Sequence, residues 1–368
     1  MSKEFNPFNP LYGTKYFCGR QKELSRLTAN IENGYNTLVH SERRIGKTTM
    51  ILRLFEILEE KGEYETIYVD LFSTSSMNDF IKHFTERILS KYHKNNLLSG
   101  IKRLLFGINA SFSLTSDGSP LLSLNILDTQ IDSTLGQIFD FLEKRKKKIV
   151  VAFDEFQEIS NYSEKAEAII RTYVQYSKNI RFIFSGSTNH ILRNMFFSAS
   201  KPFYQSSDVL VLHKIDYDTY FKYIKDTFGE FRKEIDDDAI DFILDFTDRH
   251  SYYTQFLCNI TFYKSKRKIK KDAVKLNADE ILENRRDDFM GILRLLSANQ
   301  RKIVIAVAKE NLVLRPTSGD FIKKHGLPAV SSTALAVKTL VEKEVLYAND
   351  DGYKVYDVFF KRFLQKYF

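Results

Sequence analysis

The sequence predicts an α/β fold with a parallel sheet, followed by a helical segment and a further segment of three helices and a hairpin. Apolar, strand-like runs alternate with amphipathic helices up to residue 213, and polar clusters follow several of the runs. We expect strands over residues 36–40, 65–71, 148–153, 181–185 and 209–212. We expect helices over residues 18–32, 47–61, 77–93, 131–146, 164–176 and 190–197. After residue 213 the strand pattern stops.

Residues 41–48 read as a phosphate-binding loop, because they join the apolar run at 37–39 to an amphipathic helix. Backbone N–H groups and the helix N-terminus of such a loop point at nucleotide phosphates. Lys47 would reach the β- and γ-phosphates, and the Thr48 hydroxyl would bind Mg²⁺. The predicted loop residues are Ser41, Glu42, Arg43, Arg44, Ile45, Gly46, Lys47, Thr48 and Thr49.

Ser41 stands where the phosphate-loop pattern has its first glycine. A serine there is costly if the position needs a positive φ. Glu42, Arg43 and Arg44 either contact the nucleotide or a neighbouring domain, or are solvent-facing charges. The alternative for the whole segment is an ordinary turn between a strand and a helix.

A second apolar run, residues 149–153, predicts a strand buried on both faces, and Asp154 and Glu155 come directly after it. Ligands bind at the carboxyl ends of strands in open α/β sheets. We expect Asp154 to hold Mg²⁺ and Glu155 to orient the attacking water of a phosphoryl transfer. The alternative is a solvated acidic pair that ends the strand.

The length of 368 residues allows two or three domains, and the net charge of +8 is compatible with an anionic partner. Two distant cysteines, Cys18 and Cys258, fit neither a disulfide framework nor a metal site, which favours a reducing, cytoplasmic setting. No apolar run has the roughly 20 residues of a membrane span, so we expect no membrane partner. Residues 6–10 predict an extended leader.

Residues 110–126 alternate with period two on either side of Asp117-Gly118-Ser119-Pro120, which predicts a β-hairpin inserted into the first domain, residues 1–213. The next domain, 214–289, has helical spacing over residues 217–228, 237–246 and 251–264. It also contains the basic run 263–271, which we interpret as a solvated face.

The third domain, 290–368, has the winged-helix order of three helices (298–309, 318–325, 331–343) and a hairpin around Asn349-Asp350-Asp351-Gly352. Ala334, Val337 and Val341 are the expected inner stripe of its third helix. Residues 291–368 carry 13 Lys/Arg and 7 Asp/Glu, hence most of the net charge. That charge would serve nonspecific DNA contact, but the outward face lacks the Arg, Asn or Gln that read bases. A protein-docking or autoinhibitory module is the alternative.

Four motifs together resemble the archaeal-type ATPases of the STAND group, within the wider AAA+-like P-loop class. Residues 17–24 are similar to the family's "FxGRxxEL" entry, and residues 43–48 to its "RRxGKT" loop. Residues 150–157 are similar to its "hhhDExQ" strand, and residues 182–187 to its strand ending in "SGS". The resemblance covers nearly the whole chain.

The resemblance implies a five-stranded parallel core, a helical lid and a C-terminal winged helix. It also implies ATP binding and slow Mg²⁺-dependent hydrolysis that switches the domain arrangement. Ser187 would be the γ-phosphate sensor, or else the N-cap of the next helix. Phe17 and Arg20 would lie near the adenine.

Two further departures from the family pattern concern turnover and the lid. Ser206 stands where the family's "PLYGR" has its arginine, and an arginine finger can raise the rate by about 10³–10⁵. Arg171, Arg193 and Arg249 are candidate substitutes. Residues 248–253 replace the lid's "GGxPxY".

The leading hypothesis is an intracellular ATP-dependent switch with an unidentified protein partner. One alternative is a DNA-binding protein, with duplex DNA as partner and a regulatory nucleotide. The other is a scaffold that binds nucleotide without turnover.

Overall fold

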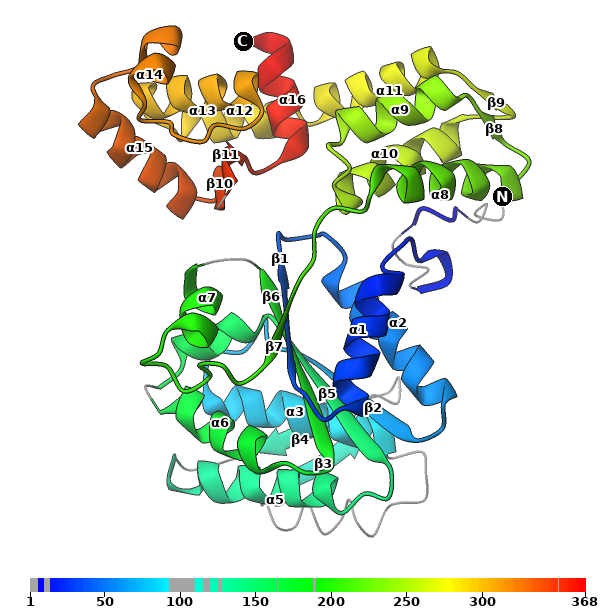
Figure 1. Ribbon diagram of the computed structural model, residues 1–368, viewed down its shortest axis with the longest axis vertical. Helices are drawn as coiled ribbons and strands as arrows, with labels where there is room; N and C mark the ends of the chain where they lie inside the picture. The colour runs from blue at the N-terminus through cyan, green and yellow to red at the C-terminus, as the bar shows by residue number, and fades with distance from the viewer. Residues whose placement is uncertain are drawn as a thin grey trace. The chain divides into compact units, whose positions relative to one another are not determined.

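The computed structural model describes residues 6–9, 14–92, 110–114, 120–124, 128–163, 165–187, 190–349 and 351–368. The chain forms two compact units (Figure 1). The first unit comprises residues 13–213, and the second comprises residues 1–12 together with 214–368. No helix of the described residues is long and apolar enough to cross a membrane.

The first unit is built on a five-stranded parallel sheet with the strand order β2-β5-β6-β1-β7. This confirms the predicted five-stranded parallel core. Its strands are β1 (Thr37–Ser41), β2 (Tyr64–Asp70), β5 (Lys148–Asp154), β6 (Ile180–Ser187) and β7 (Asp208–Val211). Its helices are α1 (Gln21–Glu32), α2 (Lys47–Glu60), α3 (Met77–Tyr92), α5 (Ile131–Glu143), α6 (Ala166–Tyr176) and α7 (His190–Phe197), with the short 3₁₀ helices η2 (Asp128–Gln130) and η3 (Phe156–Asn161).

Helices cover both faces of the sheet, which is why the central strands are apolar on both sides. On β5, Val150 and Ala152 pack with α1 and α2, whereas Val151 and Phe153 pack with α3, α5 and α6. Successive residues of a strand point to opposite faces, so a continuous apolar run is required here.

The predicted hairpin insertion is present as the antiparallel strands β3 (Ala110–Leu114) and β4 (Pro120–Leu124). Strand β4 lies beside α3. Residues 117–119 of the predicted turn lie outside the described residues.

The second unit begins with the helices α8 (Tyr217–Glu230), α9 (Asp237–Phe246), α10 (Ser251–Lys264) and α11 (Lys271–Asn284). The expectation that strands stop after residue 213 is wrong: β8 (Glu234–Ile235) and β9 (Lys268–Ile269) form a short parallel pair. The extended leader is wrong for residues 6–9, which form a turn with the N–H of Phe8 bound to the Asn6 side chain. Phe8 is buried against Phe228 and Phe262.

The chain ends in a winged-helix segment, as predicted. Its elements are α12 (Arg286–Arg294), α13 (Ala298–Glu310), α14 (Gly319–His325), α15 (Val330–Glu342), β10 (Leu346–Asn349), β11 (Gly352–Val355) and α16 (Val358–Tyr367). The predicted inner stripe of α15 is correct at Val337, wrong at Ala334, which is exposed, and only half-buried at Val341. Thr333 is buried instead, because its hydroxyl donates to the Pro328 carbonyl at 3.0 Å.

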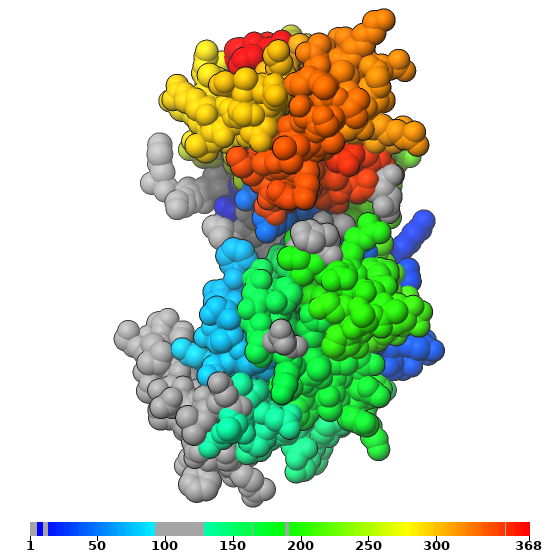
Figure 2. Space-filling view, turned by 90° about the vertical axis from the view of Figure 1, so that its left-hand side faces the viewer, coloured from blue at the N-terminus to red at the C-terminus, as the bar shows by residue number. Residues whose placement is uncertain are grey.

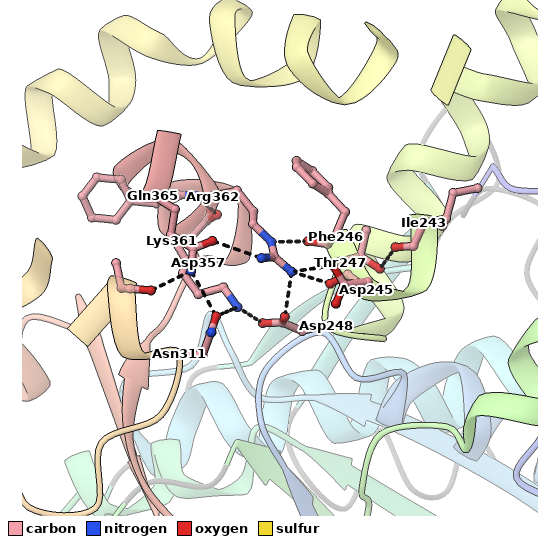
Figure 3. Close-up of polar contacts among 12 residues, drawn as sticks. Ile243, Asp245, Phe246, Thr247, Asp248, Asn311, Asp357, Lys361, Arg362 and Gln365 are labelled. Carbon is pink, nitrogen blue, oxygen red and sulfur yellow. Dashed lines mark hydrogen bonds and ion pairs between the residues drawn. The ribbon is translucent and has the colours of Figure 1, made fainter. Parts of the chain in front are cut away.

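Helix α16 is fastened to the loop after α9 by the polar cluster drawn in Figure 3. Lys361 is only 3% exposed, and its ammonium pairs with the Asp248 carboxylate. Arg362 donates to the Phe246 carbonyl at 2.9 Å and also pairs with Asp248 at 3.3 Å. Burial lowers the pKa of Lys361, and the charge of Asp248 opposes that shift.

We predict that Asp248→Asn destabilises the second unit by roughly 1–3 kcal/mol, because it leaves a buried ammonium without its counter-charge. The asparagine keeps the left-handed backbone (φ 52°) that Asp248 adopts, so the charge alone is removed. Urea unfolding measured by circular dichroism gives the loss. Asp245→Asn is the matched control, since that carboxylate is 85% exposed and should change stability by under about 0.5 kcal/mol. Equal losses in both variants would contradict the role of Asp248.

Candidate functional site

The predicted site residues converge at the carboxyl-terminal edge of the sheet, where β1, β5 and β6 lie side by side (Figure 1). Ser41, which ends β1, is opposite Ser187, which ends β6. Asp154, which ends β5, is opposite Asp70 of β2. Helix α2 begins at Lys47, immediately after the loop that leaves β1. Strand register thus gathers the loop, the acidic strand and the serine-ended strand at one edge.

The loop takes its sharpest backbone turn at Gly46, whose φ is 102°. A side chain is strained in that region, which explains the glycine directly before the helix. Ser41 has no positive φ, since it continues β1, and the steric cost considered for it does not arise. Arg44 carries the second left-handed conformation of the loop, with a φ of 60°.

Asp154 is the hydrogen-bonding centre of the site, and it is only 4% exposed. One carboxylate oxygen accepts from the Thr48 hydroxyl at 2.7 Å and from the Tyr68 hydroxyl at 2.6 Å. The other accepts from the Ser185 hydroxyl and from the Glu155 N–H at 3.0 Å. Burial and the charge of Asp154 raise the pKa of Tyr68, so its hydroxyl stays a donor.

Lys47 points back over its own loop and is 6% exposed. Its ammonium contacts the Ser41 hydroxyl at 3.4 Å and the Glu42 carbonyl at 3.3 Å. Burial lowers the pKa of Lys47, whereas the nearby charges of Glu155 and Asp154 raise it. The two contacts are long, so oxygen atoms of a phosphate would replace them at small cost.

Glu155 leaves the strand in a left-handed conformation, with a φ of 52°, and its carboxylate accepts a hydrogen bond from the Gln157 amide. The Gln157 side chain passes over Gly186. A Cβ atom at Gly186 would lie 2.2 Å from the Gln157 side-chain oxygen. A side chain at position 186 would therefore displace the Gln157 amide group, which the glycine allows to lie close to β6 while it holds Glu155.

Comparison with known proteins supplies the family. Residues 17–253 match the model of an "ATPase domain predominantly from Archaea". The chain belongs to this archaeal ATPase family. Residues 287–366 match a "Probable winged helix domain".

The similar curated proteins include the uncharacterised ATP-binding proteins MJ1006 and MJ1076 of Methanocaldococcus jannaschii, each 26% identical. The alignments cover 39% of this chain, 39% of MJ1006 and 41% of MJ1076, so the chain matches less than half the length of these relatives.

Two solved structures share the fold over nearly the whole chain. The Walker-type ATPase paby2304 of Pyrococcus abyssi has a TM-score of 0.66 at 18% identity, over 98% of this chain and 99% of that one. The Aeropyrum pernix ORC2 protein, in its ADPNP–ADP complexes, has a TM-score of 0.61 at 14% identity, over 98% and 97%.

The remaining predicted residues of this archaeal ATPase differ in how far they are buried and in whether they lie beside the loop. Ser187 is buried at the end of β6, beside the loop. Ile45 is buried, Glu42, Arg43 and Thr49 are half-buried, and Arg44 and Thr48 are exposed. Arg20 pairs with Glu23 of its own helix at 2.9 Å, and one of its buried nitrogen atoms has no hydrogen-bond partner among the described residues. The ion pair of Arg20, which directly precedes α1, is thus made with the first turn of that helix rather than with the loop.

Of the arginines considered as substitutes, Arg193 has an electrostatic link to the described edge. Its charge acts on His40 of β1, as the charge of Lys47 does. Arg171 lies on α6, and Arg249 belongs to the second unit. Ser206, which replaces the family arginine, has a buried hydroxyl without a hydrogen-bond partner in the described part of the chain.

Sequence reasoning missed Tyr68 and Ser185, both of which hold Asp154. Ser185 belongs to the "SGS" ending, and the adjacency of β5 and β6 would have pointed to it. Tyr68 lies two residues before the end of β2, and only the register of β2 with β5 reveals its contact.

The oxygen atoms of the side chains at this edge are suitable ligands for a magnesium ion. Mg²⁺ prefers hard oxygen ligands, keeps several waters and takes few protein groups. The Thr48 hydroxyl and the Asp154 carboxylate already lie within 2.7 Å of each other. No group of three or more His, Cys, Asp or Glu suited to a metal occurs among the described residues, so an all-protein cage is not offered there.

We predict that the first unit loses stability as the pH falls below about 6.5, through His40 of β1. Burial, and then the charges of Arg193 and Lys47, lower the pKa of His40 from 6.5. The unfolded chain therefore binds a proton more readily than the folded one, and acidification favours unfolding. Urea unfolding at pH 7.5 and 5.5 measures the drop, which His40→Gln should reduce. His83→Gln, on α3, is the control, and an unchanged drop in His40→Gln would contradict the assignment.

Proposed function

We propose that the protein binds ATP with Mg²⁺ and hydrolyses it slowly, as a nucleotide-controlled switch. The observation that carries the proposal is the contact of Thr48 with Asp154, beside the buried Lys47, at the carboxyl edge of the sheet. Phosphoryl transfer needs mainly positioning and charge neutralisation, and this edge offers both. Membership of the ATPase family and the names of the relatives, ATP-binding proteins, support ATP as the ligand.

The loop residues 41–49 hold the phosphates through their N–H groups, and Lys47 neutralises charge on the β- and γ-phosphates. Thr48 and Asp154 hold the metal, which supplies charge stabilisation on the phosphate oxygens when bound. Arg20, at the entry to α1, is the proposed neighbour of the base. Tyr68 and Ser185 keep the Asp154 carboxylate oriented.

Glu155 orients and polarises the attacking water, with Gln157 holding its carboxylate. Ser187, at the end of the neighbouring strand, senses the γ-phosphate. Slow turnover is expected from Ser206 in place of the family arginine, because a serine hydroxyl cannot neutralise γ-phosphate charge as a guanidinium does. Arg193 is the proposed partial substitute because its charge already reaches the edge of the sheet.

The second unit is suited to carry a switch signal, because its two segments are fastened together. We propose residues 214–289 as the lid and 290–368 as the winged-helix domain. Asp248 and Arg249, which replace the lid's glycines, have φ values of 52° and 54°. The backbone thus keeps a glycine-like conformation, while the Asp248 carboxylate binds Lys361 and Arg362 of α16 (Figure 3). A movement of this loop would be passed directly to the winged helix.

The exposed face of α15 favours a protein partner over base-specific DNA reading. Leu335 is 68% exposed, Val330 also lies at the surface, and Lys338 is near Glu342 at 3.9 Å. Figure 2 shows the orange residues of the winged-helix segment at its surface. The Aeropyrum pernix ORC1 protein, solved in complex with DNA, shares the fold with a TM-score of 0.55 at 10% identity, over 98% of this chain and 96% of that one. Duplex DNA therefore remains the second candidate partner.

We predict that Lys47→Ala reduces ATP affinity at least 100-fold, because the loop loses the charge that faces the phosphates. Isothermal titration of ATP with Mg²⁺ measures the effect. Lys61→Ala is the charge-matched control, since Lys61 lies at the exposed end of α2 and pairs with Glu32. Wild-type affinity in Lys47→Ala would contradict the proposed phosphate site.

We predict that Glu155→Gln binds ATP normally and lowers turnover by about 100-fold or more, as expected for loss of a general base. Phosphate release with Mg²⁺ measures turnover. Glu158→Gln, in the same 3₁₀ helix, should keep full activity. Undiminished hydrolysis in Glu155→Gln would remove Glu155 from its role, and wild-type protein that binds ATP without hydrolysis would favour the scaffold.

A further inference from the structure

The second unit contains a basic groove that the proposed ATPase does not use. The turn after α8 and the strands β8 and β9 come together at one end of the helical segment (Figure 1). The residues that line the groove belong to α8, to this turn, to β8 and to the position before β9. The groove has a volume of about 770 Å³. Its lining includes four cations, Lys225, Arg232, Lys233 and Arg267, and a single acid, Glu234.

Two of these cations, Lys233 and Lys225, form hydrogen bonds or ion pairs within the fold. The Lys233 ammonium donates to the Phe262 carbonyl at 2.7 Å and to that of Ser265, which ties the α8 turn to the end of α10. Lys225 pairs with Asp237 at 2.7 Å. Both ammonium groups are therefore already engaged within the fold.

Arg232 and Arg267 differ from these two lysines, and both are exposed. Neither guanidinium has an ion pair or a side-chain hydrogen bond with any residue in the described ranges. Their main chains are held in place: the Glu234 N–H donates to the Arg267 carbonyl at 2.7 Å, and the Arg232 N–H donates to the Gly229 carbonyl at 2.9 Å. Arg232 also has a left-handed backbone, with a φ of 57°. Two such guanidinium forks in one groove match the geometry of phosphate oxygens.

The basic run 263–271 continues the positive surface, with six lysines and arginines and no acid. Lys270 and Lys271 lie at the start of α11, where the helix dipole disfavours positive charge. Fold stability gains nothing from cations at that end of a helix. An anionic ligand would account for them.

An exposed aromatic ring stands at the beginning of the same run. Tyr263 is 76% exposed and lines a smaller hollow of about 130 Å³ with Asn259, Asn284 and the ion pair of Lys264 with Glu280. An exposed ring can stack on a nucleobase, and nearby amides can hydrogen-bond to it. An acidic peptide carries no such base. In duplex nucleic acid the bases are stacked inside, so such a ring suits single strands.

We propose that the groove lined by Arg232 and Arg267, which we call the α8–β9 groove, binds single-stranded nucleic acid together with the hollow at Tyr263, four positions before Arg267 in the chain. Arg232 and Arg267 hold its phosphates, and Tyr263 stacks on a base. The site lies within the second unit and does not depend on ATP binding by the first.

The test measures binding of a fluorescent 20-nucleotide oligo(dT) by the full-length protein, using anisotropy over a range of NaCl concentrations. The variant Arg232→Asn/Arg267→Gln removes both forks, and asparagine tolerates the left-handed backbone at position 232. We expect its Kd to rise at least tenfold. The slope of log K against log salt should fall by roughly 1.4, at about 0.7 for each lost phosphate contact to a single strand.

The matched control is Arg301→Gln/Lys302→Gln, which removes two exposed charges from α13 of the same unit and should change the Kd by less than twofold. Arg232→Lys/Arg267→Lys retains both charges but loses both forks, so its Kd should lie between those of the wild type and the Asn/Gln variant. A loss in the Asn/Gln variant that the lysine variant does not restore even in part, or an equal loss in the control, overturns the phosphate site. So does an unchanged Kd in the Asn/Gln variant.

Two further measurements test the class of ligand. Tyr263→Ala should weaken oligo(dT) binding about fivefold or more, and Tyr263→Phe should not. A loss in neither variant overturns the stacking role. Poly-L-glutamate that competes as well as unlabelled oligo(dT) overturns nucleic acid in favour of an acidic protein, and preference for a matched duplex overturns the single-strand assignment.

Discussion

The first unit depends on one buried carboxylate. Asp154 accepts hydrogen bonds from Thr48 of α2, Tyr68 of β2 and Ser185 of β6, so a single side chain connects a helix and two strands to β5. A buried carboxylate is tolerated only when donors surround it, because an unpaired charge in the interior is very costly. The same donors fix its orientation toward the loop. The hydrogen bonds that make the buried carboxylate stable therefore also orient it for the metal that we propose it holds.

In the second unit, the carboxylate of Asp248 likewise holds two elements together, the loop after α9 and helix α16. The loop after α9, where the resemblance implies glycines, has Asp248 and Arg249 in a left-handed conformation. A non-glycine residue there stores some strain, roughly 1 kcal/mol or more. The Asp248 carboxylate offsets that cost by neutralising Lys361 and Arg362. A departure from the family sequence thus keeps a glycine-like backbone and adds an electrostatic bond to α16.

Much of the fold could be predicted because its signals are local. The loop at 41–48 and the apolar run at 149–153 each specify a strand and the residues that come directly after it, and the structure has both. Tyr68 and Ser185 could not be assigned, because their role depends on which strands are neighbours and in what register. The β8–β9 pair has two residues in each strand, which are too few for an alternation of apolar and polar residues to be seen in the sequence. On α15 the buried Thr333 replaced Ala334 because a hydroxyl found a carbonyl partner, which composition does not reveal.

The turn at residues 6–9 has a consequence for the order in which the protein is assembled. Phe8 packs against Phe228 and Phe262, and the Asn6 amide donates to the Asn259 carbonyl, 253 positions later. The ribosome therefore releases this turn of the second unit before any of the first unit, and its packing partners only after all of it. Domains generally fold as they emerge, and contacts this distant close last. The parallel sheet is complete while Phe8 is still exposed. Residues 6–9 are therefore synthesised before the sheet but are buried after it has formed.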